Sequence, residues 1–115
     1  MLKVYGIKNC NSMKKAFDLL NELGLQYEFH DYKKQGIDAE SVKKWLDEKG
    51  ADLILNKKGT TWKKLSEQEQ QHALASEGNL IETLVNHTSM IKRPVITDGT
   101  VKVVGFDEAQ IRALK

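Results

Sequence analysis

The sequence has a single cysteine, a single proline and no long apolar run. One cysteine excludes an internal disulfide, so we expect a protein of the reducing cytoplasm. No apolar segment approaches the ~18 residues of a membrane-spanning helix, and the N-terminus predicts a strand rather than a signal peptide. A net charge of +2 is too small to indicate a nucleic-acid partner. His30, His72 and His87 are scattered without ligand spacing, so no metal site is predicted.

The first third of the chain alternates between strand-like and helix-like patterns. Residues 2–7 are rich in β-branched and aromatic side chains, which predicts a strand. Residues 25–30 alternate apolar and polar side chains, which predicts a second strand. Between them, four apolar residues recur at helical spacing: Ala16, Leu19, Leu20 and Leu23. Together these segments predict a β-α-β unit.

The middle of the chain predicts helices. Asp38 is a candidate cap for the first, and Ser66 with Glu69 forms a capping box for another. We expect Asn79 to open a third helix. These signals place a helical insertion at residues 38–88.

The C-terminal third returns to strands. A predicted strand follows Pro94, the Asp98-Gly99 pair predicts a hairpin turn, and residues 101–104 supply the second arm. Asp107 and Gln110 predict the start of a last helix. The β-α-β and β-β-α halves can share one four-stranded mixed sheet with helices on its faces. We therefore predict an α/β, thioredoxin-like fold in which residues 1–115 form a single, monomeric domain with the insertion inside it.

The only cysteine, Cys10, falls between the first predicted strand and the first predicted helix. A helix N-terminus presents unpaired N–H groups and the positive end of the helix dipole, which favour thiolate over thiol. A thiol of pKa ~8.5 is about 3% ionised at pH 7, and lowering the pKa by ~2 units makes it roughly three-quarters ionised. A lone cysteine is also often a small buried hydrophobe. The position of Cys10 between a strand and a helix, and the lysines near it in the sequence, favour a reactive thiol over a buried structural one.

The neighbours of Cys10 are candidate substrate-binding residues. Lys8 adds positive potential two residues upstream. Asn11 and Ser12 are both able to cap the helix, and Ser12 can instead donate a hydrogen bond to the sulfur. The sequence does not choose between these two caps.

The segment "MIKRPVI", residues 90–96, holds the second catalytic candidate, Arg93, directly before Pro94. In thioredoxin-like folds the loop before the third strand approaches the active-site helix. In that arrangement the guanidinium of Arg93 faces the sulfur of Cys10, where it stabilises thiolate and binds an oxyanion or carboxylate through a forked contact. The alternative is a surface arginine beside an ordinary turn proline.

Four segments together resemble the arsenate reductase (ArsC)-like family, closest to its small YffB branch, with the Spx regulators as relatives: "YGIKNCNSMKKA", "FHDYKKQGID", "LNKKGTTWKKL" and "SMIKRPVITDGTVKVVGF". The resemblance covers nearly the whole chain in order. It implies a thioredoxin-like fold with an inserted helical subdomain and a redox-active cysteine at the position of Cys10. It also implies an arginine before a cis-proline, matched by Arg93 and Pro94.

The chain departs from the family pattern around the cysteine. Glutathione-coupled arsenate reductases of this family carry three arginines there, and only Arg93 is clearly matched. The middle position aligns with Asn56, where Lys57 and Lys58 are nearby substitutes and candidate binding residues. The last position falls near Gly105. Because lysine does not reproduce the planar fork of arginine, efficient arsenate reduction is not expected.

A single thiol without a resolving partner must be regenerated by an external thiol. We therefore expect a glutathione-dependent thiol reductase, with glutathione as co-substrate and glutathione or a glutaredoxin as partner. The alternative is a Spx-like module that binds RNA polymerase, although Met13 stands where many Spx proteins have their second cysteine. A third alternative is an adaptor without activity.

Overall fold

A computed structural model describes all 115 residues of the chain as two compact units. The first comprises Met1–Gln35 and Arg93–Lys115, and the second comprises Gly36–Lys92. The second unit is wider at both ends than the insertion expected at 38–88. No helix in the structure has the length and apolarity to cross a membrane.

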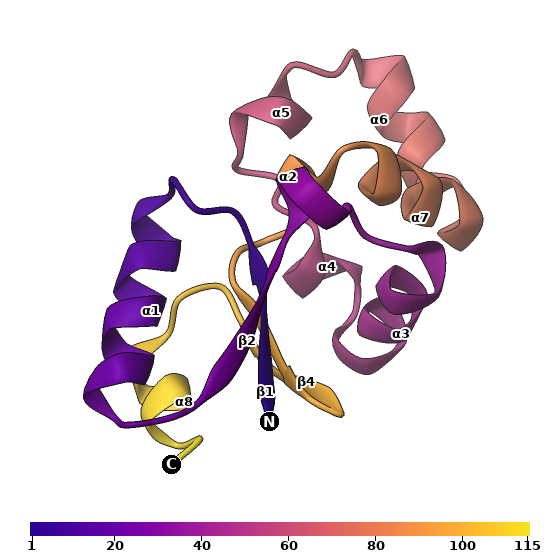
Figure 1. The fold of residues 1–115 in the computed structure, drawn as a ribbon. Helices are drawn as coiled ribbons and strands as arrows, with labels where there is room; N and C mark the ends of the chain where they lie inside the picture. Colours follow the sequence, from indigo (N-terminus) through magenta and orange to yellow (C-terminus); the bar gives the residue numbers. More distant parts are fainter. The chain divides into compact units, whose positions relative to one another are not determined.

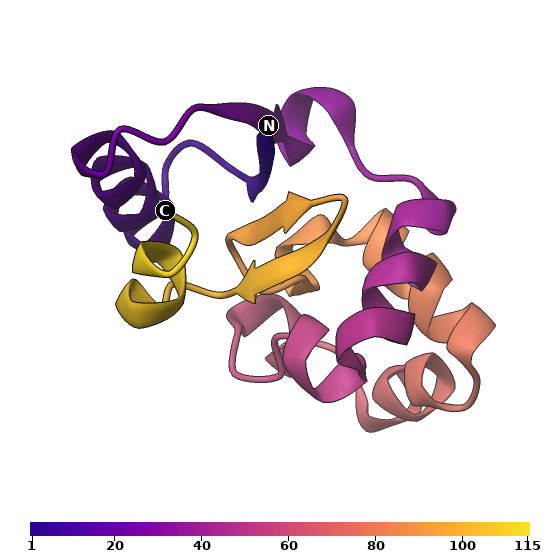
Figure 2. The ribbon, with the colours of Figure 1, turned by 90° about the horizontal axis from the view of Figure 1, so that it is seen from below.

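The first unit contains the four-stranded mixed sheet that the sequence predicts. Its strands are β1 (Leu2–Gly6), β2 (Tyr27–Asp31), β3 (Val95–Asp98) and β4 (Thr100–Val104). They lie in the order β2-β1-β3-β4, with β1 parallel to β2 and antiparallel to β3, and with β3 antiparallel to β4. The β3–β4 hairpin turns at Gly99, whose φ of 77° favours glycine. Figure 2 shows the two strands of this hairpin in orange.

Two helices, α1 (Asn11–Glu22) and α8 (Glu108–Arg112), pack together against one face of this sheet (Figure 1). Alternate residues of β1 are buried, because Leu2, Val4 and Gly6 point toward these helices while the residues between them point away. The buried residues of this core are Leu2, Val4, Met13, Ala16, Leu19, Leu20, Ile96, Val103 and Ile111. The sulfur-bearing residue Cys10 packs at the edge of the same cluster.

The second unit is helical. It contains α3 (Ala39–Lys49), α4 (Ala51–Ile54), α5 (Thr60–Lys63), α6 (Glu67–Leu74), α7 (Glu77–Asn86) and the 3-10 helix η1 (Thr88–Met90). Helix α7 contacts both α3 and α6. The buried hydrophobic residues of the unit are Ile37, Val42, Trp45, Leu46, Ile54, Leu55, Trp62, Ala73, Leu80, Leu84, Met90 and Ile91.

Some predicted boundaries are confirmed and others are wrong. Asp38 caps α3, and Ser66 with Glu69 forms a complete capping box at α6. Helix α7 does not open at Asn79: it begins two residues earlier, because the hydroxyl of Ser76 accepts the Asn79 N–H at 3.1 Å. The second strand covers 27–31 instead of 25–30, and the short helix α2 (Tyr32–Gln35) follows it directly.

Candidate active site around Cys10

Cys10 is the N-cap residue of α1, four residues after β1 ends. Its backbone is extended, with φ −150° and ψ 133°, and its carbonyl oxygen accepts the N–H of Lys14 at 2.9 Å. The expectation that Asn11 or Ser12 caps the helix is wrong. Both lie within the first turn, and no side chain makes a capping hydrogen bond there. The N–H groups of that turn therefore remain directed toward the sulfur and its surroundings.

The surroundings of the Cys10 sulfur favour its anion. Partial burial alone raises the pKa of the thiol. The backbone N–H of Met13, the side chain of Arg93 and the backbone N–H of Ser12 act in the opposite direction, so the net pKa is lowered below the ordinary value. Each of these groups donates toward the sulfur, and Arg93 adds a positive charge.

Arg93 reaches Cys10 because of the sheet register. Tyr5 of β1 pairs with Val95 of β3, so the residues just before β3 lie beside the end of β1 that leads to the thiol. The Arg93–Pro94 peptide bond is cis, as the family resemblance implies. Pro94 is buried, and its carbonyl oxygen accepts the N–H of Gly105 at 2.8 Å.

Gly105 lies near the position at which, by the family resemblance, the glutathione-coupled reductases carry their last arginine. Its φ is 78°, a conformation that favours glycine over residues with a side chain. This position therefore holds a turn against Pro94 and supplies no cation. Of the three arginine positions, the structure places a guanidinium at the thiol only from Arg93.

A hollow of about 370 Å³ opens beside the thiol. This volume is near the lower end of the ~300–1,000 Å³ of small-molecule sites, so a ligand of tripeptide size is only partly enclosed. Its lining residues are Lys8, Asn9, Cys10, Asn11, Lys14, Phe17 and Asp18. Of the predicted binding residues, Lys8 and Asn11 line this hollow, and Ser12 contributes its N–H. Their roles stay predictions.

Lys57 and Lys58 belong to the second unit, where both are exposed in a turn between α4 and α5. Asn56, the position aligned with the family's middle arginine, precedes them, and its N–H donates to the carbonyl of Met90 at 2.7 Å. The part of these two lysines in the chemistry of Cys10 stays a prediction.

Tyr32 is a polar residue of the first unit that the sequence reasoning missed. Its side chain is buried, and its hydroxyl has no hydrogen-bond partner. An unsatisfied buried hydroxyl costs about 1–3 kcal/mol, so it calls for an explanation. The available signal was an aromatic residue at the end of a strand beside β1. The strand predicted over residues 25–30 ends before Tyr32, so the pattern does not place this residue beside β1.

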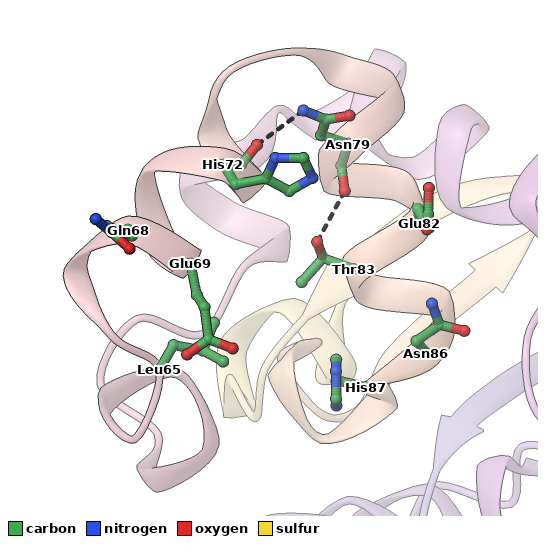
Figure 3. Close-up of a pocket in the computed structure, with 9 residues that line it drawn as sticks. All are labelled: Leu65, Gln68, Glu69, His72, Asn79, Glu82, Thr83, Asn86 and His87. Carbon is green, nitrogen blue, oxygen red and sulfur yellow. Dashed lines mark hydrogen bonds between the residues drawn. The ribbon is translucent and has the colours of Figure 1, made fainter.

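A second hollow, of about 300 Å³, lies between α6 and α7 in the second unit (Figure 3). The Asn79 side chain crosses its upper rim and donates to the carbonyl of His72 at 2.9 Å, and the Thr83 hydroxyl donates to the carbonyl of Asn79 at 2.8 Å. No three histidine, cysteine or carboxylate side chains converge as a metal site. The first of these hydrogen bonds joins α7 to α6 and the second lies within α7, and we assign no ligand to this hollow.

The lowered pKa of Cys10 predicts its reactivity profile. The rate of alkylation by iodoacetamide, followed against pH, is expected to reach half-maximum below the ~8.5 of an ordinary thiol. The reason is that the first-turn N–H groups and Arg93 keep the thiolate populated at lower pH. In urea, which removes both, the midpoint is expected to return to the ordinary value. A folded-state midpoint at or above that of the unfolded chain would contradict the electrostatic description of the site.

Comparison with known proteins agrees with this fold. Residues 5–114 match the ArsC family. The chain is 33% identical over 113 residues to an uncharacterized protein of Haemophilus influenzae, covering 98% of this chain and 97% of that one. It is 26% identical over 114 residues to the global transcriptional regulator Spx of Listeria innocua, covering 97% and 85% of the two chains.

Two solved structures are similar over nearly the whole length. The protein YFFB is 42% identical with a TM-score of 0.90, and the match covers 98% of this chain and 97% of that one. An arsenate reductase (ArsC) related protein from Brucella melitensis is also 42% identical, with a TM-score of 0.75 and coverage of 97% and 92%. With its sheet order, its cysteine at the start of α1 and an arginine before a cis-proline, the chain belongs to the ArsC family.

Proposed function

We propose that this protein is a glutathione-dependent thiol reductase that uses one nucleophilic cysteine. The observation that carries the proposal is the Cys10 sulfur at the N-terminus of α1, with its pKa lowered by first-turn N–H groups and by Arg93. A thiolate is the reactive form in thiol–disulfide exchange. Membership of the ArsC family, whose relatives include arsenate reductase related proteins, supports a redox role for this thiol.

The proposed reaction has two exchange steps. The Cys10 thiolate attacks one sulfur of an oxidised thiol substrate, an S–S bond to Cys10 forms, and the substrate's other sulfur leaves as a thiolate that takes a proton from water. Glutathione thiolate then attacks this mixed disulfide, restores the Cys10 thiolate and carries away the oxidised sulfur. The electrons come from glutathione. A lone thiol of this kind fits the reducing cytoplasm.

Several predicted residues have a place in this scheme. Arg93 holds an anionic group of the substrate or of glutathione through a charge-assisted contact. Lys8 and Asn11 contact the reactants from the hollow, and the first-turn N–H of Ser12 supports the thiolate. Buried Pro94 fixes the entry of the chain into β3.

Mass spectrometry tests the proposal directly. After exposure to oxidised glutathione, the protein is expected to gain one glutathionyl group, located on Cys10 by peptide mapping, and a Cys10→Ser variant is expected to gain none. Reduced glutathione is then expected to remove the group and to restore the thiol. Failure of either adduct formation or release excludes this reaction.

A second candidate function is supported by the 26% identity to the Listeria Spx regulator. A regulator of that type acts by binding RNA polymerase, and its chemistry is secondary. Met13 stands one helical turn after Cys10 and is fully buried, so no internal Cys-x-x-Cys switch exists in this chain. A pull-down with the polymerase α subunit separates the two functions, because the reductase proposal requires no binding.

A further inference from the structure

One side of α1 lines the hollow beside the thiol. Cys10 caps the helix, and Lys14, Phe17 and Asp18 follow it by four, seven and eight residues and line the same hollow. Side chains at this spacing lie on one side of a helix. With a rise of about 1.5 Å per residue, Lys14 lies about 6 Å and Asp18 about 12 Å along the axis from Cys10. A molecule that is bonded to the sulfur and lies in the hollow therefore passes Lys14 before it reaches Asp18.

Phe17 gives this hollow a fixed apolar wall. Its ring stacks on that of Tyr27 with centroids 5.5 Å apart, and it meets the Phe29 ring edge-on at 5.1 Å. Both partners belong to β2, so the ring is held between the helix and the sheet. The charged groups of the hollow are thus presented from a helix whose own packing is fixed, which favours a defined binding geometry.

The two charges on this side of α1 are not paired with each other. Lys14 and Asp18 are both exposed, and neither side chain makes a hydrogen bond or an ion pair within the protein. The same Lys-x-x-x-Asp spacing in α3 does form an ion pair, between Lys43 and Asp47 at 3.1 Å. Both charges at the hollow are therefore available to a ligand.

The charges are positive near the sulfur and negative farther from it. Lys8, two residues before Cys10, adds a second cation, and Asp18 is the only anionic residue in the lining. A ligand that suits this order has a carboxylate on a short arm from its sulfur and an ammonium on a longer arm. Glutathione has this arrangement, because its glycyl carboxylate ends the shorter arm and its ammonium lies at the end of the longer, γ-glutamyl arm.

We propose that Asp18 binds the ammonium, and Lys14 the glycyl carboxylate, of a glutathione moiety whose sulfur reacts with Cys10. Both residues then determine specificity and take no part in the bond changes. This inference rests on the proposed function and narrows its substrates to disulfides that carry both charges. Because each ion pair is exposed to solvent, each contributes a modest factor to the rate.

The test uses three disulfides that differ by one charged group. Oxidised glutathione has both groups, the disulfide of N-acetylglutathione lacks the ammonium, and the disulfide of glutathione glycyl ethyl ester lacks the glycyl carboxylate. In each reaction the Cys10 thiolate forms an S–S bond to one sulfur, the disulfide's own S–S bond breaks, and the other half leaves as a thiolate. Quenched mass spectrometry gives the rate of adduct formation.

Asp18→Asn is expected to slow the reaction with oxidised glutathione about threefold and not to slow the reaction with the N-acetylated disulfide. The direction of this effect separates a contact from the general field of the protein. Oxidised glutathione is a net anion, so the loss of a carboxylate that acts only through its field would speed the reaction. In about 1 M NaCl the slowing is expected to shrink, because salt screens exposed charges.

Lys14→Gln is expected to slow the reaction with oxidised glutathione about threefold and that with the glycyl ester less than about 1.5-fold. Lys15→Gln is the matched control. Its ammonium lies over the Phe106 ring, 6.0 Å from the centroid, and it does not line the hollow. It is expected to preserve the ratio of these two rates. Glu22→Gln, one turn beyond Asp18, is the control for the carboxylate, because Glu22 pairs with Arg112 at 3.0 Å.

S-methylglutathione, which has no S–S bond to exchange, separates binding from reaction. It is expected to protect wild-type Cys10 from iodoacetamide and to protect the Asp18→Asn and Lys14→Gln proteins less. If Asp18→Asn reacts with oxidised glutathione as fast as the wild type, or if Lys15→Gln changes the rate ratio as much as Lys14→Gln, the inference is overturned while the proposed function stands. If wild-type Cys10 forms no adduct, the proposed function fails, and the protection measurement alone decides the roles of Lys14 and Asp18.

Discussion

Replacing Arg93 with alanine is expected to slow mixed-disulfide formation between Cys10 and oxidised glutathione at pH 7 by about a hundredfold. Two effects combine. Arg93 lowers the pKa of the thiol, so its removal raises that pKa and leaves less thiolate at neutral pH. The proposed anchor for an anionic group of glutathione is lost as well. Stopped-flow or quenched mass spectrometry gives the rate, and iodoacetamide alkylation against pH gives the midpoint.

Two further variants separate these effects. Arg93→Lys keeps the charge but not the fork, so we expect it to restore most of the alkylation midpoint and little of the rate with oxidised glutathione. Arg112 is the matched control, because it is exposed on α8 and paired with Glu22 and Glu108, each at 3.0 Å. Arg112→Ala is expected to change neither quantity. An Arg93→Ala protein with the wild-type midpoint and rate removes Arg93 from the mechanism.

The position of Cys10 could be predicted because the spacing of the apolar residues changes there. In β1 every second residue is buried, in α1 the buried residues recur at helical spacing, and Cys10 lies between the two segments. The cap could not be predicted. Asn11 and Ser12 have better capping side chains, but the helix begins where the chain leaves the strand, and at that point Cys10 has the extended backbone. Tertiary pairing of β1 outweighed local capping preference.

The missed Tyr32 has a similar cause. Residues from Leu25 onward alternate, so the pattern alone does not say where the strand starts or stops. The boundary is set by pairing with β1, in which Leu2 faces Tyr27 and Gly6 faces Asp31. Pairing of this kind is a long-range property that a short window of sequence does not contain. The predicted strand consequently ends at His30 and leaves out Tyr32, whose ring stacks on that of Tyr5.

In the helical unit, local sequence signals predict more of the structure than they do in the sheet. Its longer helices have strong local signals, such as the Ser66–Glu69 capping box, and were predicted. Helices α4 and α5 have four residues each, too few to display a helical period. At α7, both Ser76 and Asn79 are cap-forming residues, and only the geometry shows that the first accepts from the second.

The second large effect is expected from Gly6→Ala, which we predict to destabilise the protein by about 1–3 kcal/mol. Gly6 ends β1 directly under the first turn of α1. A methyl group there would overlap the Sδ and Cε atoms of Met13, whose side chain is fully buried in the core. Either Met13 leaves its packing or α1 moves. Urea denaturation measures the loss of stability.

The same substitution is expected to raise the alkylation midpoint of Cys10. The N–H of Met13 is one of the groups that lower the pKa of the thiol, so a shift of this turn weakens the support for the thiolate. The close approach of strand and helix at Gly6 thus links core packing to reactivity. An unchanged midpoint in a destabilised Gly6→Ala protein would show that Met13 alone rearranges while the backbone of α1 stays in place.

Two controls distinguish overlap from the general effect of alanine. Gly78→Ala in α7 meets no atom closer than 4.0 Å, so we expect it to stabilise its helix by about 0.5–1 kcal/mol. In a Met13→Ala background, which itself costs about 2–5 kcal/mol, the new methyl group at position 6 has room. Gly6→Ala is then expected to cost far less than in the wild type, because two residues in contact do not act additively. Equal costs in both backgrounds would mean that the contact with Met13 is not what requires glycine at the base of the thiol's helix.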